Sequence, residues 1–471
     1  FAQMAMPLPM DPNVRYGKLD NGLTYYIRHN EKPENRADFY IAQKVGSVLE
    51  EENQRGLAHF LEHMAFNGTT NLPGMTLRNY LQSRGVKFGE NLNAYTAIDE
   101  TVYMVTNVQT DLPGLVDTCL LILHDWSSFI ALEEAEIDNE RGVILEEERT
   151  TGGANRRAQE TLFPIMYPNS PYGARLPIGT KEVIANFTYQ ELRDYYNKWY
   201  RPDLQGLIIV GDIDVDAIEA RIKEMFADIP APVNPAERTQ FMIEDNAEPI
   251  VAIASDPELT STSLQIFYKH DVTPDAYKQS PDYWMSQYVL NLISQMQINR
   301  LQELTQKPNP PFVGGYSYFG DYYLAPTKAA WTSYAVPKDN ASIEEALTAL
   351  VVENKRMQQH GFTASEYERA KADFMKRVES AYNERNNTEN EKHVDACLEH
   401  FLHNEPMMDI ETEYQLYQQV IPNLPLEAIN QFAAQLVRED NLVITLTAPQ
   451  KEGETLPTEE ELLAMYNKAY A

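Results

Sequence analysis

Cysteines, basic residues and long apolar runs are all scarce in this chain of 471 residues. Only Cys119 and Cys397 occur, so no framework of disulfide bonds is expected. No apolar run reaches the roughly 18 residues of a membrane-spanning helix, and no membrane span is predicted. With 39 basic against 70 acidic residues, the chain is unsuited to nucleic acid, which needs a basic surface. A negative field instead favours basic or neutral peptides.

The length is sufficient for roughly two to four domains with sizeable cores. A proline-rich segment predicts a linker at residues 229–239, because it can continue neither a helix nor a central strand. This linker separates residues 15–228 from residues 240–450. Residues 1–14 are rich in Met and Pro and are expected to form an extended arm. A helix within residues 451–471 reaches the last residue without a cap, as if the sequence continued.

Hydrophobic periodicity predicts strands and helices in a similar order in both halves. In the first half, strands are expected at 16–27 (a hairpin turning at Asn21-Gly22), 37–45, 92–95, 101–108 and 207–210, and helices at 76–83, 112–127, 132–151, 189–198 and from 214 to 227. In the second half, strands are expected at 250–255, 264–270, 314–319, 331–336 and 442–447, with helices at 283–304 and four between 342 and 437. By pattern alone, this suggests an internal repeat.

One apolar stretch carries two imidazoles and a carboxylate at helical offsets. His59 and His63 lie one turn apart on a helix, with Glu62 beside them. Two neutral imidazoles can hold zinc, and the adjacent carboxylate can take a proton from a metal-bound water. The order is the inverted form of the His-Glu-x-x-His peptidase helix. A chance surface turn is disfavoured by Phe60 and Leu61, which predict a buried helix whose polar groups need partners.

A catalytic zinc ion needs a third protein ligand. In the helix expected at 132–151, Glu140 and Glu147 are about 20° apart on one face, whereas Glu146 points elsewhere. From the residues alone, either glutamate can be the ligand. An exposed acidic helix in an acidic protein is the alternative.

A second possible metal cluster occurs near the end of the chain. His393, Cys397 and His400 share one helical stripe. Zinc sites with thiolate and imidazole ligands usually draw on more than one segment, and no second segment is found. A packed helix with a buried free cysteine is therefore expected.

Three motifs carry a resemblance to a known family: His59-x-x-Glu62-His63, Asn93-Ala94-Tyr95-Thr96, and the Glu-Arg-Gly-Val-Ile-Leu-Glu-Glu segment that begins at Glu140. In these motifs the chain resembles the pitrilysin, insulinase and mitochondrial processing peptidase family of inverted zincins. The resemblance covers nearly the whole chain, as the N-terminal catalytic half. It implies an α+β fold of two similar α/β-sandwich domains, each a mostly antiparallel sheet packed on helices, forming half of a clamshell. Residues 15–228 would be the catalytic zinc domain and residues 240–450 a second homologous domain without zinc ligands.

The resemblance also implies roles for individual residues. His59, His63 and Glu147 would bind Zn²⁺, Glu140 would assist them, and Glu62 would be the general base. A further group would contact substrate: Phe66, Asn93, Ala94, Tyr95 and Tyr316. The strand that contains Asn93 would receive the peptide as an added strand. Thr305 stands where the family has a positioning arginine, so that arginine would come from another part of the enzyme.

The expected function is that of a zinc-dependent endopeptidase which hydrolyses unfolded peptides in a closed chamber. Its partners would be the peptide substrate and a second homologous half, either fused or a separate subunit. The alternative is a non-catalytic half that binds peptides or acts as a scaffold, with a structural or vestigial metal site. The first residues, Phe1-Ala2-Gln3, are compatible with the remnant of a secretory cleavage region. This favours a periplasmic or exported location, with a cytoplasmic one as the alternative.

Overall fold

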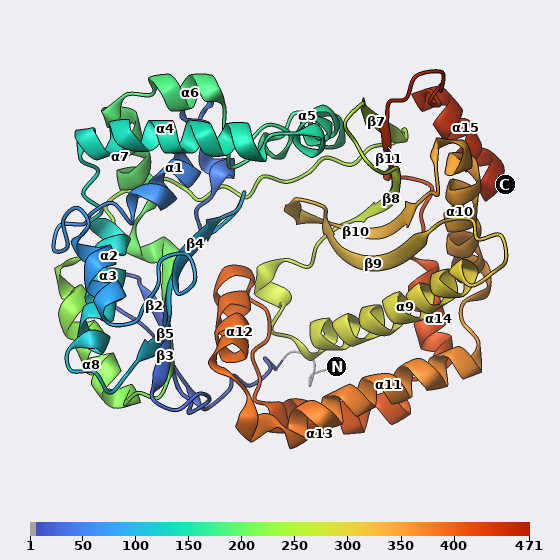
Figure 1. Ribbon diagram of the computed structural model, residues 1–471. Coiled ribbons are helices and arrows are strands. Elements are labelled where there is room, and N and C mark those ends of the chain that lie inside the picture. The colour runs from blue at the N-terminus through green and yellow to red at the C-terminus, as the bar shows by residue number, and fades with distance from the viewer. Residues whose placement is uncertain (1–5) are drawn as a thin grey trace.

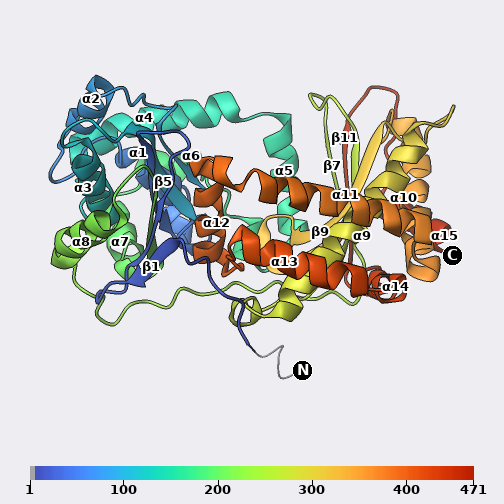
Figure 2. The same ribbon diagram turned by 90° about the horizontal axis from the view of Figure 1, so that it is seen from below.

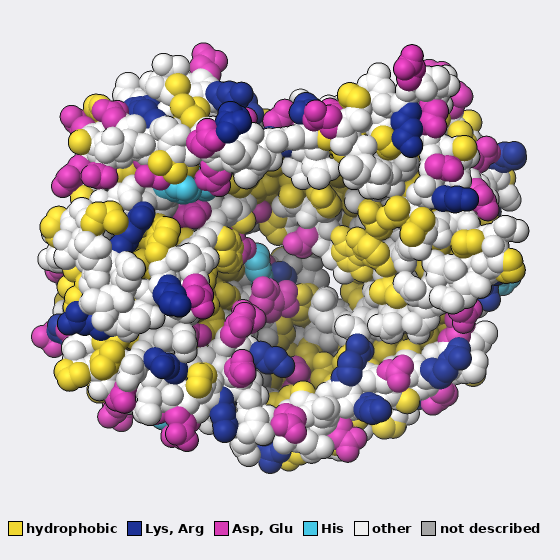
Figure 3. All heavy atoms as spheres, viewed as in Figure 1, with side chains coloured by type: hydrophobic (Ala, Val, Ile, Leu, Met, Phe, Trp, Pro, Cys, Tyr) yellow, Lys and Arg dark blue, Asp and Glu magenta, His cyan; other side chains and the backbone are white. Residues whose placement is uncertain are grey.

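The computed structural model describes residues 6–471 and contains two β-sheets, each packed against helices (Figure 1). Residues 1–5, which include the possible cleavage remnant and the start of the predicted arm, lie outside the described residues. A space-filling view shows a hollow between the two halves of the molecule, with acidic side chains around it (Figure 3).

The first sheet has six strands in the order β1-β2-β6-β3-β5-β4. All neighbours are antiparallel except β2 and β6. The strands are β1 (Val14–Lys18), β2 (Thr24–His29), β3 (Arg36–Gln43), β4 (Leu92–Thr96), β5 (Thr101–Gln109) and β6 (Gln205–Gly211). The accompanying helices are α1 (Leu57–Met64), α2 (Thr76–Ser83), α3 (Leu115–Ser128), α4 (Glu134–Thr151), α5 (Ala154–Met166), α6 (Lys181–Asn186), α7 (Tyr189–Trp199) and α8 (Val215–Met225).

The second sheet has five strands in the order β7-β11-β8-β10-β9, and only β7 and β11 are parallel. The strands are β7 (Ile250–Asp256), β8 (Ser263–His270), β9 (Gly314–Tyr322), β10 (Ala325–Val336) and β11 (Leu442–Pro449). The helices are α9 (Pro281–Thr305), α10 (Ile343–His360), α11 (Ala364–Asn383), α12 (Asn390–His403), α13 (Ile410–Val420), α14 (Leu426–Ala434) and α15 (Glu459–Tyr470). The prediction of an α+β fold with two mostly antiparallel sheets packed on helices is confirmed.

Helix α12 packs on the first sheet, although it belongs to the second half of the sequence. Figure 2 shows α11 and α13 running between the two halves and α12 lying beside the first sheet. Every residue of β6 is buried because the main core covers one face of the sheet and α12 covers the other. Within the described chain, residues 229–249 form neither helix nor strand, a longer connection than the predicted linker.

Two residues of the stripe of His393, Cys397 and His400, namely Cys397 and His400, take part in this packing. Cys397 is a free, buried cysteine in the cluster between α12 and the sheet, as expected. The Nδ1 atom of His400 forms a hydrogen bond of 2.7 Å with the hydroxyl of Tyr26 on β2. The cluster therefore joins the helix to the sheet. No helix in residues 6–471 combines the length and the apolar character of a membrane span.

Candidate metal centre

The helix that carries the two imidazoles, α1, is held at its N-terminus by a buried carboxylate. Gly56 precedes the helix with φ of 106°. Glu50 Oε1 accepts a hydrogen bond from Gly56 N at 3.0 Å, and Glu50 Oε2 accepts one from Ala58 N at 2.8 Å. Burial raises the pKa of Glu50 to about 8, although both N–H bonds act in the opposite direction. The side chain satisfies N–H groups that every helix leaves free at its start.

Replacing Glu50 by alanine is expected to lower the free energy of unfolding by about 2 kcal/mol or more, because two buried N–H groups lose their acceptors. Weaker zinc binding is expected as well, since α1 carries both imidazoles. Urea unfolding and chelator competition would measure the two effects. Glu248→Ala, at an exposed position, is the control. Identical unfolding midpoints for the two variants would contradict the proposed cap.

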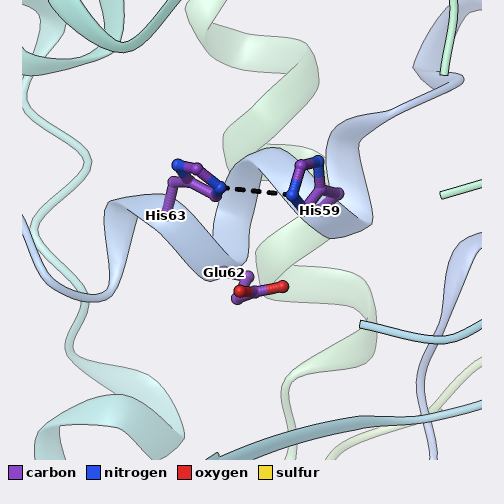
Figure 4. Close-up of side chains that lie close together, drawn as sticks. All are labelled: His59, Glu62 and His63. Carbon is purple, nitrogen blue, oxygen red and sulfur yellow. Dashed lines mark hydrogen bonds between the residues drawn. The ribbon is translucent and has the colours of Figure 1, made fainter. Parts of the chain in front are cut away.

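The imidazoles of His59 and His63, on α1, lie close to the carboxylate of Glu147, on α4. His59 Nε2 and His63 Nε2 are 3.2 Å apart (Figure 4). Glu147 Oε1 is 3.5 Å from His59 Nε2, and Glu147 Oε2 is 3.3 Å from His63 Nε2. Three side chains from two helices therefore bring potential ligand atoms close together.

This donor set fits zinc. Bonds of about 2.0–2.1 Å in a tetrahedral site place neighbouring ligand atoms about 3.3 Å apart, close to the separations found here. Burial and the neighbouring His63 lower the pKa of His59 to about 3, so this imidazole is neutral, the form that binds metals. Burial also lowers the pKa of His63, but the hydrogen bond to Glu140 and nearby carboxylates outweigh it and raise the pKa overall. The surroundings of His63 thus favour positive charge.

Glu140 lies behind His63. Its Oε1 is 2.8 Å from His63 Nδ1, and its Oε2 accepts a hydrogen bond of 2.7 Å from Asn67 Nδ2. Arg78 Nη2 in turn donates to Asn67 Oδ1 at 3.0 Å. Both oxygens of Glu140 are thereby engaged, and a proton on His63 Nδ1 leaves the lone pair on Nε2. Glu140 and Glu147 therefore face opposite edges of the same imidazole.

Glu62 lies beside the imidazoles but has a different partner. Thr96 Oγ1, at the end of β4, donates to Glu62 Oε2 at 2.5 Å. Burial raises the pKa of Glu62, against the opposing effects of this bond and of His63. Potential ligand atoms of His59, Glu62 and His63 lie within 4.8 Å of one another, so distance alone would also allow Glu62 as a ligand. Of Glu62 and Glu147, however, only Glu147 makes close contacts with both imidazoles among the described residues.

The strand β4 is an edge strand next to α1. It pairs with β5 on one side only, which leaves its other edge open in the described sheet. Asn93 and Tyr95 are exposed, and Ala94 is half-buried. Asn93 Nδ2 donates to Gly89 O at 3.2 Å, and the Tyr95 hydroxyl donates to Glu100 Oε2 at 2.8 Å. An edge of this kind can accept an added strand.

The other two predicted substrate residues differ in position. Phe66 is only 4% exposed and packs edge-to-face against Trp126 and Phe88, whereas Phe88 is 53% exposed. A contact between Phe66 and substrate remains a prediction. Of Phe66 and Phe88, Phe88 has the exposed ring. Tyr316 lies on β9, in the second sheet, and stacks on Tyr334 with 4.9 Å between ring centroids. In Figure 1, β9 and α1 lie in different halves of the molecule.

Four residues around the site were not predicted: Glu50, Asn67, Arg78 and Thr96. Asn67 follows His63 by four positions, so it continues the stripe of His59 and His63, a signal that the sequence did contain. Thr96 stands in the motif that carried the family resemblance. Glu50 and Arg78 come from other segments and have no local signal.

Two family models match the chain. The model of Insulinase (Peptidase family M16) matches residues 26–176, and that of the Peptidase M16 inactive domain matches residues 186–374. A zinc protease PQQL-like of Arabidopsis thaliana is 32% identical over 437 residues, which are 92% of this chain and 42% of that protein. The probable zinc protease PqqL of Escherichia coli (strain K12) is 30% identical over 426 residues, 90% of this chain and 45% of that protein.

Solved structures give the same picture. The first half of the periplasmic protease PqqL from Escherichia coli matches with a TM-score of 0.87 and 27% identity, over 99% of this chain and 98% of that chain. The match to the structure of the whole protease covers 51% of its chain. The chain thus spans less than half the length of these two curated relatives.

Proposed function

Because the chain belongs to the insulinase-type peptidases of family M16, we propose that it is the zinc-carrying half of a metalloendopeptidase. The observation that carries this proposal is the convergence of His59, His63 and Glu147, with a second acidic side chain, that of Glu62, beside the two imidazoles. The substrates are unfolded peptides, because an extended chain fits an open strand edge. By analogy with the periplasmic PqqL protease, we propose an exported or periplasmic location.

In this proposal His59, His63 and Glu147 hold the zinc ion, and Glu140 keeps the His63 ring in place. Zinc bound there supplies Lewis-acid chemistry that makes water more acidic and the peptide carbonyl more electrophilic. Glu62 takes the proton of the attacking water through a carboxylate oxygen and then gives it to the leaving amine. Burial of Glu62, which raises its pKa, suits a group that must both accept and release a proton.

The edge of β4 at Asn93, Ala94 and Tyr95 would bind the peptide backbone. Backbone hydrogen bonds do not depend on the side chains of the peptide, so this binding tolerates many sequences. Tyr316 would contact substrate from the other half of the molecule. Thr305, at the end of α9, donates its hydroxyl to Gln302 O at 2.6 Å and cannot supply the charge of an arginine.

We propose further that a second homologous half closes the hollow. Supplying this half, fused or in trans, is expected to raise kcat/KM by at least about a hundredfold, because it restores substrate positioning and a charged hydrogen bond. Hydrolysis of a quenched peptide by the zinc-loaded protein, with and without the second half, would measure the effect.

Two outcomes would contradict this scheme. Equal activity in both preparations would mean that the second half is unnecessary and that another copy of this chain closes the hollow. Full zinc content without hydrolysis in the paired preparation would favour a half that binds peptides or acts as a scaffold. Zinc content and turnover must therefore be measured on the same samples.

A further inference from the structure

Thr96 is the last residue of β4, three positions after Asn93 on the strand that we propose binds substrate. Side chains alternate along a strand, so Thr96 faces the same way as Leu92, which is 1% exposed and lies in the core. This is the side on which α1 packs against β4. The hydroxyl thereby reaches Glu62 Oε2 at 2.5 Å.

The sheet fixes the position of this hydroxyl. Thr96 is paired with Thr101 in the β4–β5 register, and Thr101 Oγ1 donates to Val45 O at 2.7 Å. The turn between the two strands is closed by a hydrogen bond of 2.7 Å from Ala97 N to Glu100 O. These hydrogen bonds fix the backbone at the end of β4, where Thr96 lies. The Thr96 side chain is β-branched, which restricts its rotation about χ1.

We propose that Thr96 is a positioning residue that aligns Glu62 with a peptide bound on β4. The hydroxyl holds Oε2 of Glu62, which leaves Oε1 as the oxygen without a protein partner in the described contacts. Since Thr96 and the proposed substrate edge belong to one strand, the position of the peptide and the orientation of the base are set by the same element. This inference rests on the proposed peptidase function.

A merely structural role would give a different pattern of effects. If Thr96 acted only by packing, loss of its methyl group would matter as much as loss of its hydroxyl, and zinc content or stability would fall together with activity. If it acts by orienting Glu62, only the hydroxyl matters. The effect would then be on kcat, since the Thr96 side chain points away from the exposed face on which Asn93 and Tyr95 lie.

Two substitutions separate these roles in the zinc-loaded protein paired with its second half. Thr96→Val keeps the shape and removes the hydroxyl, whereas Thr96→Ser keeps the hydroxyl. We expect Thr96→Val to lower kcat about 10- to 100-fold, the usual effect of losing a hydrogen bond to a charged group, while KM changes less than about twofold. Thr96→Ser is expected to stay within about threefold of the parent protein in kcat.

Readouts other than activity complete the test. Elemental analysis should give the same zinc content for both variants. Fluorescence anisotropy with a labelled peptide, in a Glu62→Gln background that does not turn over, should give the same Kd with threonine or valine at position 96. Near-normal kcat in Thr96→Val, or equal losses in both variants, would overturn the inference. An inactive parent protein would instead overturn the proposed function, and this inference with it.

Discussion

Glu62→Gln is expected to lower kcat by about a thousandfold or more while zinc content and stability stay unchanged. The amide has nearly the same shape as the carboxylate and can still accept the hydrogen bond from Thr96, which is 2.5 Å long in the parent protein. It cannot take a proton from water at neutral pH. Glu62 makes none of the close imidazole contacts that Glu147 makes, so a donor set for zinc remains.

The measurement is hydrolysis of a quenched peptide by the paired, zinc-loaded variant, together with elemental analysis and urea unfolding. Glu353→Gln is a matched control, because Glu353 is 8% exposed and lies on α10, in the second half of the chain. It should keep its turnover. Near-normal cleavage by a stable, zinc-loaded Glu62→Gln variant would refute the role of Glu62 as base.

Local sequence patterns predicted the helix that carries the candidate metal centre and the family of the chain. The offsets of His59, Glu62 and His63 predicted one helical face, and the structure has all three on α1. The family resemblance, which rested on three short motifs, is confirmed by the two M16 family models. The shared face of α1 was accessible because periodicity within one helix determines which side chains are neighbours.

Features that depend on distant segments were not predictable in this way. Glu50 caps α1 from a preceding loop, and nothing in its neighbourhood marks it as buried. Helix α12 covers the first sheet from more than 150 residues away along the chain from β6, so β3 and β6 are buried on both faces. Phe66 was predicted as a substrate contact from the family resemblance, but only the folded structure shows that Phe88, the ring in contact with Phe66, is the exposed one.

The two glutamates of α4 show the same limit within one helix. Glu140 and Glu147 were expected on one face, and both approach the imidazoles. A helical wheel shows no position along the helix axis, and the separation of seven positions between these glutamates amounts to about 10.5 Å of rise. That rise brings Glu140 to the Nδ1 edge of His63 and Glu147 to the Nε2 atoms of both rings. Only the tertiary packing of α1 against α4 separates their roles.

Glu147→Gln is therefore expected to remove most of the bound zinc and nearly all activity, since the two imidazoles that remain cannot fill the coordination shell. Glu140→Gln should behave differently. It loses the charge that orients His63, which typically weakens metal binding about 10- to 100-fold, so zinc should return at higher free concentrations. Competition with a chromophoric chelator would rank the two affinities.

Glu146→Gln is the matched control for these variants, because Glu146 is the neighbour of Glu147, is exposed and pairs with Arg149 at 2.5 Å. Its zinc affinity should equal that of the parent protein. The geometry requires the order Glu146→Gln, Glu140→Gln, Glu147→Gln, from strongest to weakest binding. Full zinc occupancy in Glu147→Gln with loss in Glu140→Gln would reverse the assignment. The ligand would then approach His63 from its Nδ1 edge, where Glu140 now lies 2.8 Å away.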